Sequence, residues 1–322
     1  MRWRFLGLGN YSFYAVMGAV VWCLLLLSCG TGIETGRQIT DKDVRRVLEH
    51  AGNESLTPTL EAYIDSLPAW KQGKRFWVTD DKVREMLLAS DVCNPDTLYL
   101  ANHVLIYAGC VNNGLLMGEK SKVDILFQDE ATGQELVYRY GRAVEASRSG
   151  FSLPLLIDLD MVEFMARQLE DKEYYIRTSI WYDRQSEQMI DGRHFIKVHI
   201  DSVRPGNSVL PLRVLFTVAD TGERAMVWMS DNSTTMLGRS FDALFTVVDP
   251  RHSYPDISDE NWFHITQSQV VEGMTKEECR LALGNPKRTS ENPDQSGLRE
   301  YWYYDGGAFL FFVDGLLSQY RR

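Results

Sequence analysis

Two stretches of the chain, VDILFQDEATGQELVYRY at residues 123–140 and LRVLFTVADTGERAMVWM at residues 212–229, align without a gap. In each stretch a Thr-Gly pair separates two runs of apolar, β-branched or aromatic residues. That pattern is typical of a β-hairpin, because the flanking runs suit a sheet and the central pair suits a turn. The sequence therefore predicts two small β-rich modules, which are either copies of one unit or independent hairpins of similar composition.

The residues before each hairpin extend the likeness. GKRFWV at residues 73–78 corresponds to DKEYYI at residues 171–176, although the intervening lengths differ. A helix behind Asp80-Asp81 accounts for the longer first copy. Between the copies, Asp158 is expected to cap a helix whose apolar residues fall within 161–165.

Composition describes a folded chain with an acidic surface. The 322 residues include 44% hydrophobic and 24% charged residues, with a net charge of -10. The mean hydropathy of -0.25 excludes a polytopic membrane protein. Nucleic acid is not expected as a partner, because phosphate binding needs clustered cations.

The N-terminal segment predicts export. Arg2 and Arg4 precede an uncharged run from Phe5 to Ser28, which has the order of a secretory signal. Its end, LLSC at residues 26–29, resembles the lipobox of bacterial lipoproteins, which implies acylation of Cys29 and a membrane partner through that anchor. Gly30, the residue after the cysteine, resembles the residue found there in lipoproteins that are sorted to the outer membrane. The alternative to a cleaved lipoprotein signal is an uncleaved signal anchor, because the uncharged run could span a bilayer.

Three cysteines remain in the expected mature chain, at positions 93, 110 and 279. One possibility is a disulfide between Cys93 and Cys110. The other is that all three cysteines are small buried apolar residues.

Helical periodicity beginning at Thr40 and again over residues 60–67 predicts a small helical segment before the first β module.

The last sixty residues carry the clearest local signals. A helix capped by Ser258 comes first, and Thr275 with Glu278 forms a capping box for a second helix. Three strands are then expected at 299–304, 308–313 and 316–320, with a polar loop over 287–297. The residues that define these caps and turns are Gly273, Thr275, Glu278, Gly284, Pro286, Asp314 and Gly315.

This order of two helices and three antiparallel strands, with its Gly-Met-Thr-x-Glu-Glu and Phe-Val-Asp-Gly-Leu motifs, resembles the SmpA/OmlA (BamE-like) domain of bacterial envelope lipoproteins. The resemblance covers about residues 262–322. It implies an αα-β3 sandwich at the periplasmic face of the outer membrane, working as a protein–protein adaptor in β-barrel assembly. The expected fold class is thus α+β.

The expected domains combine these signals. They are a lipoprotein signal peptide at 1–28, a tether and helical segment at 29–70, a first β-rich module at 71–157, a helix with a second module at 158–250, and the BamE-like domain at 251–322.

Four adjacent aromatic residues, Tyr301, Trp302, Tyr303 and Tyr304, form the candidate interaction site. Successive side chains of a strand point to opposite faces, so one alternating pair is exposed if the other lies in a core. We expect Trp302 and Tyr304 to be the exposed pair. Contact with the β modules of the same chain is the alternative.

No residue pattern predicts catalysis, a metal site or a cofactor. His194 and His199 are five apart in an expected strand and so face opposite sides. The acidic pairs Asp80-Asp81 and Asp129-Glu130 are expected as a helix cap and a solvated turn.

Two functions remain. The first is a lipid-anchored envelope adaptor with an unidentified protein partner. The second is a glycan-binding or hydrolytic lipoprotein that uses Trp77, Trp181 or Trp228.

Overall fold

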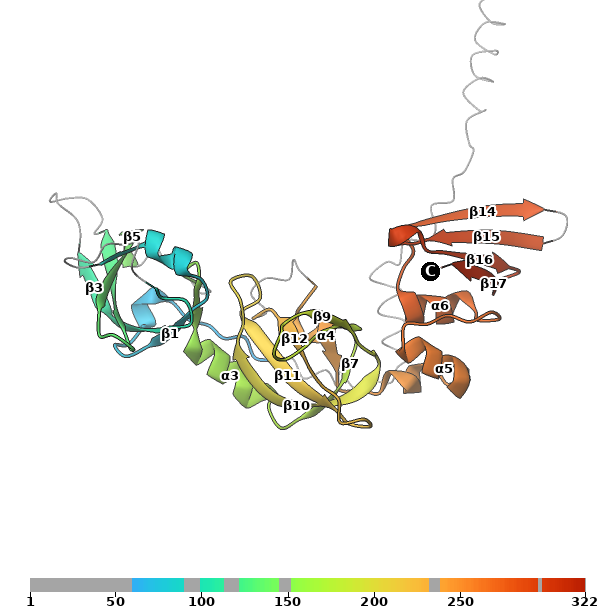
Figure 1. The fold of residues 1–322 in the computed structure, drawn as a ribbon, viewed down its shortest axis with the longest axis horizontal. Helices are drawn as coiled ribbons and strands as arrows, with labels where there is room; N and C mark the ends of the chain where they lie inside the picture. Colours follow the sequence, from blue (N-terminus) through green and yellow to red (C-terminus); the bar gives the residue numbers. More distant parts are fainter. Residues whose placement is uncertain are drawn as a thin grey trace, which may run out of the picture. The chain divides into compact units, whose positions relative to one another are not determined.

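The computed structural model describes residues 60–89, 99–112, 122–144, 152–231, 238–294 and 297–321. These residues form three antiparallel sheets, each with its own core cluster (Figure 1). The predicted signal, Cys29, the helix from Thr40 and Cys93 lie outside the described residues.

The first sheet has six strands in the order β2-β5-β4-β3-β1-β6. Two 3-10 helices, η1 (Leu67–Ala69) and η2 (Asp81–Glu85), accompany it, and Asp80 caps η2 as expected, by accepting a bond from the Lys82 amide. The strands are β1 (Arg75–Val78), β2 (Leu87–Ala89), β3 (Val104–Asn112), β4 (Val123–Asp129), β5 (Glu135–Arg142) and β6 (Leu156–Asp158).

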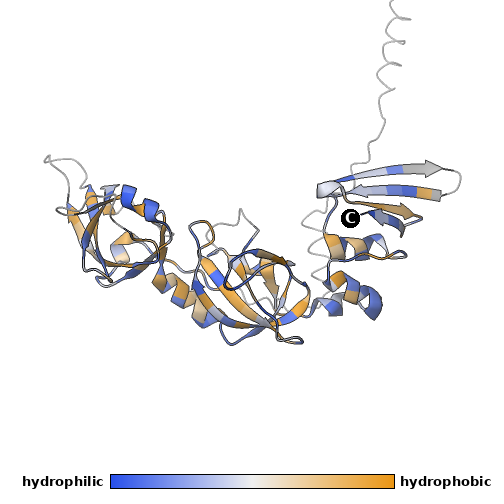
Figure 2. Ribbon diagram, in the orientation of Figure 1, coloured by the Kyte–Doolittle hydropathy of each residue, from blue (hydrophilic) through white to orange (hydrophobic). Residues whose placement is uncertain are grey.

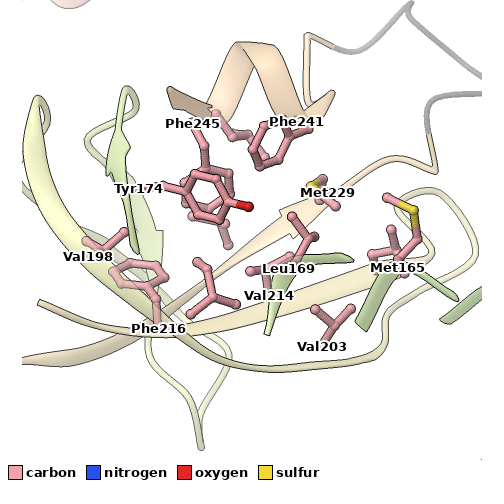
Figure 3. Packing of buried hydrophobic residues seen from close by; sticks show 14 of the residues in the cluster. Met165, Leu169, Tyr174, Val198, Val203, Val214, Phe216, Met229, Phe241 and Phe245 are labelled. Atoms are coloured by element: carbon pink, nitrogen blue, oxygen red, sulfur yellow. The ribbon is translucent and has the colours of Figure 1, made fainter. Parts of the chain in front are cut away.

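The second sheet has seven strands in the order β13-β7-β10-β11-β12-β8-β9 and packs against helix α3 (Leu159–Leu169). In its core, Met165 and Leu169 of α3 lie near Val214 and Met229 of the sheet, and the Tyr174 ring lies beside Phe241 and Phe245 (Figure 3). The other elements are β7 (Glu173–Ile176), β8 (Ile180–Tyr182), β9 (Met189–Asp191), β10 (Ile196–Pro205), β11 (Leu212–Val218), β12 (Arg224–Met229), α4 (Phe241–Leu244) and β13 (Phe245–Thr246).

These two sheets share one strand plan. The run β5-β4-β3-β1-β6 of the first corresponds to β12-β11-β10-β7-β13 of the second. The aligned Thr-Gly turns place Gly133 and Gly222 at φ +73° and +72°, which glycine adopts without strain. A β-bulge follows Tyr107 on β3 and Ile200 on β10, residues that pair with the aligned Phe127 and Phe216.

Backbone bonds at the start of each copy match as well. The Tyr107 amide donates to Lys74 O at 2.7 Å, and the Ile200 amide donates to Lys172 O at 2.9 Å. Strands β1 and β7 also share one alternation of exposed and buried residues. Matched topology, bulges and turn conformations support a repeated unit over coincidental hairpins.

The third sheet has four strands in the order β14-β15-β16-β17. Helices α5 (Asp259–Thr266) and α6 (Lys276–Leu283) lie on one side of it (Figure 1), and most of α5 is hydrophilic (Figure 2). A 3-10 helix, η6 (Pro250–Ser253), precedes them, and the remaining elements are β14 (Arg288–Asp294), β15 (Gly297–Tyr303), η7 (Asp305–Gly307), β16 (Phe309–Val313) and β17 (Leu316–Arg321).

The expected α+β fold class is wrong. The protein is mostly β-sheet, with three antiparallel sheets and a half-barrel. At the C-terminus the αα-β3 expectation misses a strand, because residues 288–294 of the expected polar loop pair with β15 from Arg288 opposite Tyr303 to Asp294 opposite Gly297. This edge strand is polar and contains a proline, so its composition concealed it.

The helix expected over residues 60–67 is also absent from the described chain. Residues 60–66 are irregular, and only the short η1 follows. The apolar residues of this segment serve two cores, since Leu60 packs in the cluster of the second sheet and Leu67 in that of the first. A single helical face over residues 60–67 would not reach both core clusters, so the segment stays irregular.

Candidate functional site

The C-terminal sheet has one face against its helices and one face turned away from them. Trp302, Leu310 and Phe312 lie in the core cluster on the helix side, so strand alternation turns their neighbours to the opposite face. We call that opposite face the outer aromatic face. The cross-strand register groups its described side chains as Arg288, Ser290, Arg299, Tyr301, Tyr303, Phe309, Phe311, Val313, Leu316, Gln319 and Arg321.

Four aromatic rings occupy the middle of this face. Tyr301 stacks on Phe311 of the adjacent strand, with ring centroids 4.6 Å apart and planes 29° apart. Tyr303 lies opposite Phe309 in the same register. All four side chains are partly exposed. Two β-strands thus present a continuous aromatic surface on which a partner can pack.

Arginines border the rings. The guanidinium carbon of Arg288 lies 4.4 Å from the ring centroid of Tyr303, and that of Arg321 lies 5.5 Å from the centroid of Phe309. Arg299 is a third arginine in the group, and none of its described side chains is acidic. The outer aromatic face is therefore locally basic in a chain of net charge -10.

The expectation that Trp302 and Tyr304 are the exposed pair is wrong. Trp302 is fully buried, and its indole Nε1 donates to the buried Glu300 carboxylate, which also pairs with Lys276. Tyr304 packs against the same core and donates its hydroxyl to Gly284 O at 3.2 Å. Burial raises the pKa of Tyr304 to about 12. The exposed side of the strand belongs to Tyr301 and Tyr303.

The predicted cap and turn residues hold this sheet in place. Thr275 and Glu278 form the expected capping box at the start of α6. The amide of Gly273 donates to Leu317 O at 2.7 Å, which joins the approach to α6 to strand β17.

Two turns complete the support. Gly284 ends α6 at φ +79° and ψ -169°, a conformation that favours glycine, and Pro286 follows it. Asp314 and Gly315 turn β16 into β17 at φ +50° and +85°. The Asp314 carboxylate accepts the Leu298 amide at 3.0 Å, so these residues act as scaffold.

A buried lysine is surrounded by three aspartates beside the first sheet. Lys74 Nζ lies 2.7 Å from Asp158, 2.9 Å from Asp160 and 3.0 Å from Asp65, and it donates to the Tyr63 hydroxyl at 2.9 Å. Burial acts to lower the pKa of Lys74, but the hydrogen bonds to Asp158, Tyr63 and Asp160 outweigh it and raise that pKa. Lys74 is therefore a fixed cation, unsuited to nucleophilic or general-base chemistry.

A second paired group lies at the β4–β5 turn. Asp129 is buried, unlike the solvated turn residue that the sequence suggested, and it accepts bonds from Thr132 at 2.6 Å and His103 Nδ1 at 3.0 Å. Burial acts to raise the pKa of Asp129, but these bonds and one from the Ala131 amide lower it overall. The aspartate holds its own turn and the neighbouring strand together.

The residues of the glycan hypothesis do not form an exposed platform. Trp181 and Trp228 are buried, and Trp77 packs partly buried against the second core. His194 is also buried, and it bonds Leu281 O through Nε2 at 3.0 Å and Ser268 through Nδ1 at 3.2 Å.

Comparison with known proteins finds no matching family model, no matching curated protein and no matching solved structure. Within the described ranges, no group of three or more His, Cys, Asp or Glu side chains is arranged to hold a metal ion. In the same part of the chain, no helix is long and apolar enough to cross a membrane.

Proposed function

We propose that this chain is a lipid-anchored protein of the bacterial envelope that binds another protein through the outer aromatic face. The observation that carries the proposal is the row of Tyr301, Tyr303, Phe309 and Phe311 on the side of the sheet away from its helices. Tyrosine and arginine are, with tryptophan, enriched at binding hot spots, and both types lie on this face.

The chemistry of the face suits a protein partner. Aromatic rings supply large contact areas at low cost in side-chain entropy, since each has two rotatable bonds. Arg288 stacks on Tyr303, which leaves the in-plane N–H groups of its guanidinium able to bond a carboxylate or carbonyl. The anchor in the proposal comes from the LLSC pattern that ends at Cys29.

Site-specific photocrosslinking in intact cells tests the docking surface. A photoreactive phenylalanine analogue replaces Tyr303 in one strain. In the control strain it replaces Tyr320, which is 46% exposed on β17 and alternates away from the outer aromatic face. We expect one discrete protein adduct from position 303, none from position 320, and loss of the adduct when Phe311→Ala is added.

Equal crosslinking from both positions would refute the docking surface. The anchor is tested separately by labelling cells with an alkyne fatty acid. We expect label on the wild-type chain and none on Cys29→Ala, and equal labelling of both would contradict the lipoprotein assignment.

A further inference from the structure

A cavity of about 580 Å³ lies beside the end of strand β7 and the last turn of helix α6. Direct contacts join its two sides. The His194 amide donates to Thr266 O at 2.9 Å, and its ring Nε2 bonds Leu281 O. The Phe195 ring stacks on Trp262 with centroids 5.8 Å apart. The cavity walls are therefore tied together by packed and hydrogen-bonded residues.

The lining of this cavity is basic. Arg177, Arg239 and Arg280 all line it, together with Ser268, and none of the described residues around it is an aspartate or glutamate. The whole chain has 44 acidic and 34 basic residues. Three guanidinium groups around a carboxylate-free cavity produce a local positive potential that opposes the net charge of the protein.

The three guanidinium groups keep hydrogen-bonding capacity. The guanidinium carbon of Arg280 lies 4.7 Å from the centroid of the Trp302 ring. This contact uses the flat face of the guanidinium group and leaves the N–H groups at its edge available for hydrogen bonds. The Nη1 group of Arg177 donates a hydrogen bond to Asp242 O at 2.7 Å, and the other N–H groups of this guanidinium stay available. Arg239 Nη1 is buried and has no hydrogen-bond partner in the described structure. A desolvated, unpaired charged donor is costly, so an anionic acceptor at this site would stabilise the protein.

Compensation of the α6 dipole is the alternative explanation for the arginines, because the last carbonyls of a helix carry partial negative charge. Two of these carbonyls already have other partners. Leu281 O bonds His194, and Gly284 O accepts the Tyr304 hydroxyl. The arginines are therefore not needed to satisfy them.

We propose that this cavity binds a small ligand through an oxyanion group, a phosphate or a carboxylate, held by Arg177, Arg239 and Arg280. Guanidinium groups match the geometry of both anions because two parallel N–H donors meet two oxygens. This binding site goes beyond the proposed docking function and is independent of it.

The test uses the full chain in detergent with inorganic phosphate and citrate as probes, and sodium chloride at equal ionic strength as the reference. Calorimetric titration and thermal unfolding give the affinity and the stabilisation. Arg239→Gln removes the unpaired donor, and Arg177→Gln serves as a second, exposed-site variant should the first fail to fold. Arg204→Gln, at an exposed position of β10, is the matched control.

We expect phosphate or citrate to bind the wild type and Arg204→Gln equally. Arg239→Gln and Arg177→Gln are each expected to weaken that binding at least tenfold. The tighter of the two probes identifies the ligand group as phosphate or carboxylate. Absence of stabilisation beyond sodium chloride would overturn the proposal, as would an equal loss of affinity in Arg204→Gln.

Discussion

Replacement of Lys74 by methionine is expected to destabilise the first module severely. The Lys74 side chain is only 5% exposed, and it neutralises Asp65 and Asp158, whose side chains are 17% and 18% exposed. Asp160 is 53% exposed, so water stabilises much of its charge without the lysine. Removing one partner of a buried ion pair typically costs about 3–5 kcal/mol, and we expect about 3 kcal/mol here.

The repeat supplies a matched control for this prediction. Lys172 occupies the equivalent position before β7, but among the described residues its ammonium group donates to Gln168 O alone, at an exposed site. Lys172→Met is therefore expected to change stability by less than about 0.5 kcal/mol. Native-state hydrogen exchange of the β1 and β3 amides measures the loss of stability within the first module. If Lys74→Met costs no more than Lys172→Met, the assigned role of the buried cluster is wrong.

The effect of Lys74→Met also depends on pH. Burial raises the pKa of Asp158 above its usual range, and the hydrogen bond from Lys74 opposes that rise. Without the lysine, the folded-state pKa of Asp158 rises further, so the folded variant takes up a proton before the unfolded chain does. Its stability should therefore increase as pH falls through that raised pKa. We expect the difference from wild type to be largest near neutrality and smaller at about pH 5, and a constant difference would contradict the argument.

Three further changes test other parts of the structure. Gly192→Ala should cost about 1–3 kcal/mol in urea unfolding, since an added Cβ would lie 2.0 Å from the buried Trp181 ring, and wild-type stability would refute this close approach. Thr275→Ala should cost about 1 kcal/mol by removing the α6 cap, and an unchanged unfolding midpoint would count against the cap. Burial lowers the pKa of His194 below 6.5, so the unfolded chain takes up the proton first and stability falls as pH drops below about 6.5. Thermal unfolding at several pH values should show a weaker slope in His194→Gln, and an unchanged slope would assign the pH dependence to other groups.

The sequence predicted the features that depend on neighbouring residues. The aligned hairpins were readable because the Thr-Gly turns and the apolar runs beside them act locally. The same holds for the Thr275–Glu278 capping box, whose two bonds join residues three apart. These motifs specify secondary structure without reference to the remainder of the chain.

The sequence failed where pairing or packing decides the outcome. Strand β14 is polar and becomes a strand only through its register with β15. The run 301–304 is aromatic on both faces, so composition could not show that Trp302 points to the core. Glu300 lies two residues earlier on the same face as Trp302 and accepts its indole N–H, and an acidic residue at that position did not indicate a buried face.

The two lysines illustrate the same limit. Lys74 and Lys172 occupy equivalent positions before aligned strands, yet only Lys74 is buried among carboxylates. Its partner Asp158 lies far from it in sequence, and Asp65 belongs to the irregular segment before it, so no local pattern unites the three residues. Long-range contacts therefore distinguish two sites that the sequence presents as alike.

Tyrosine footprinting tests the docking role of the outer aromatic face most directly. Labelling by a small tyrosine-reactive reagent is compared between the purified full chain and intact envelopes, with mass spectrometry reporting each residue. We expect Tyr303 to be labelled in the purified chain and protected in envelopes, whereas Tyr320 is labelled in both. Equal labelling of Tyr303 in both preparations, or no labelling of it in the purified chain, would contradict the account.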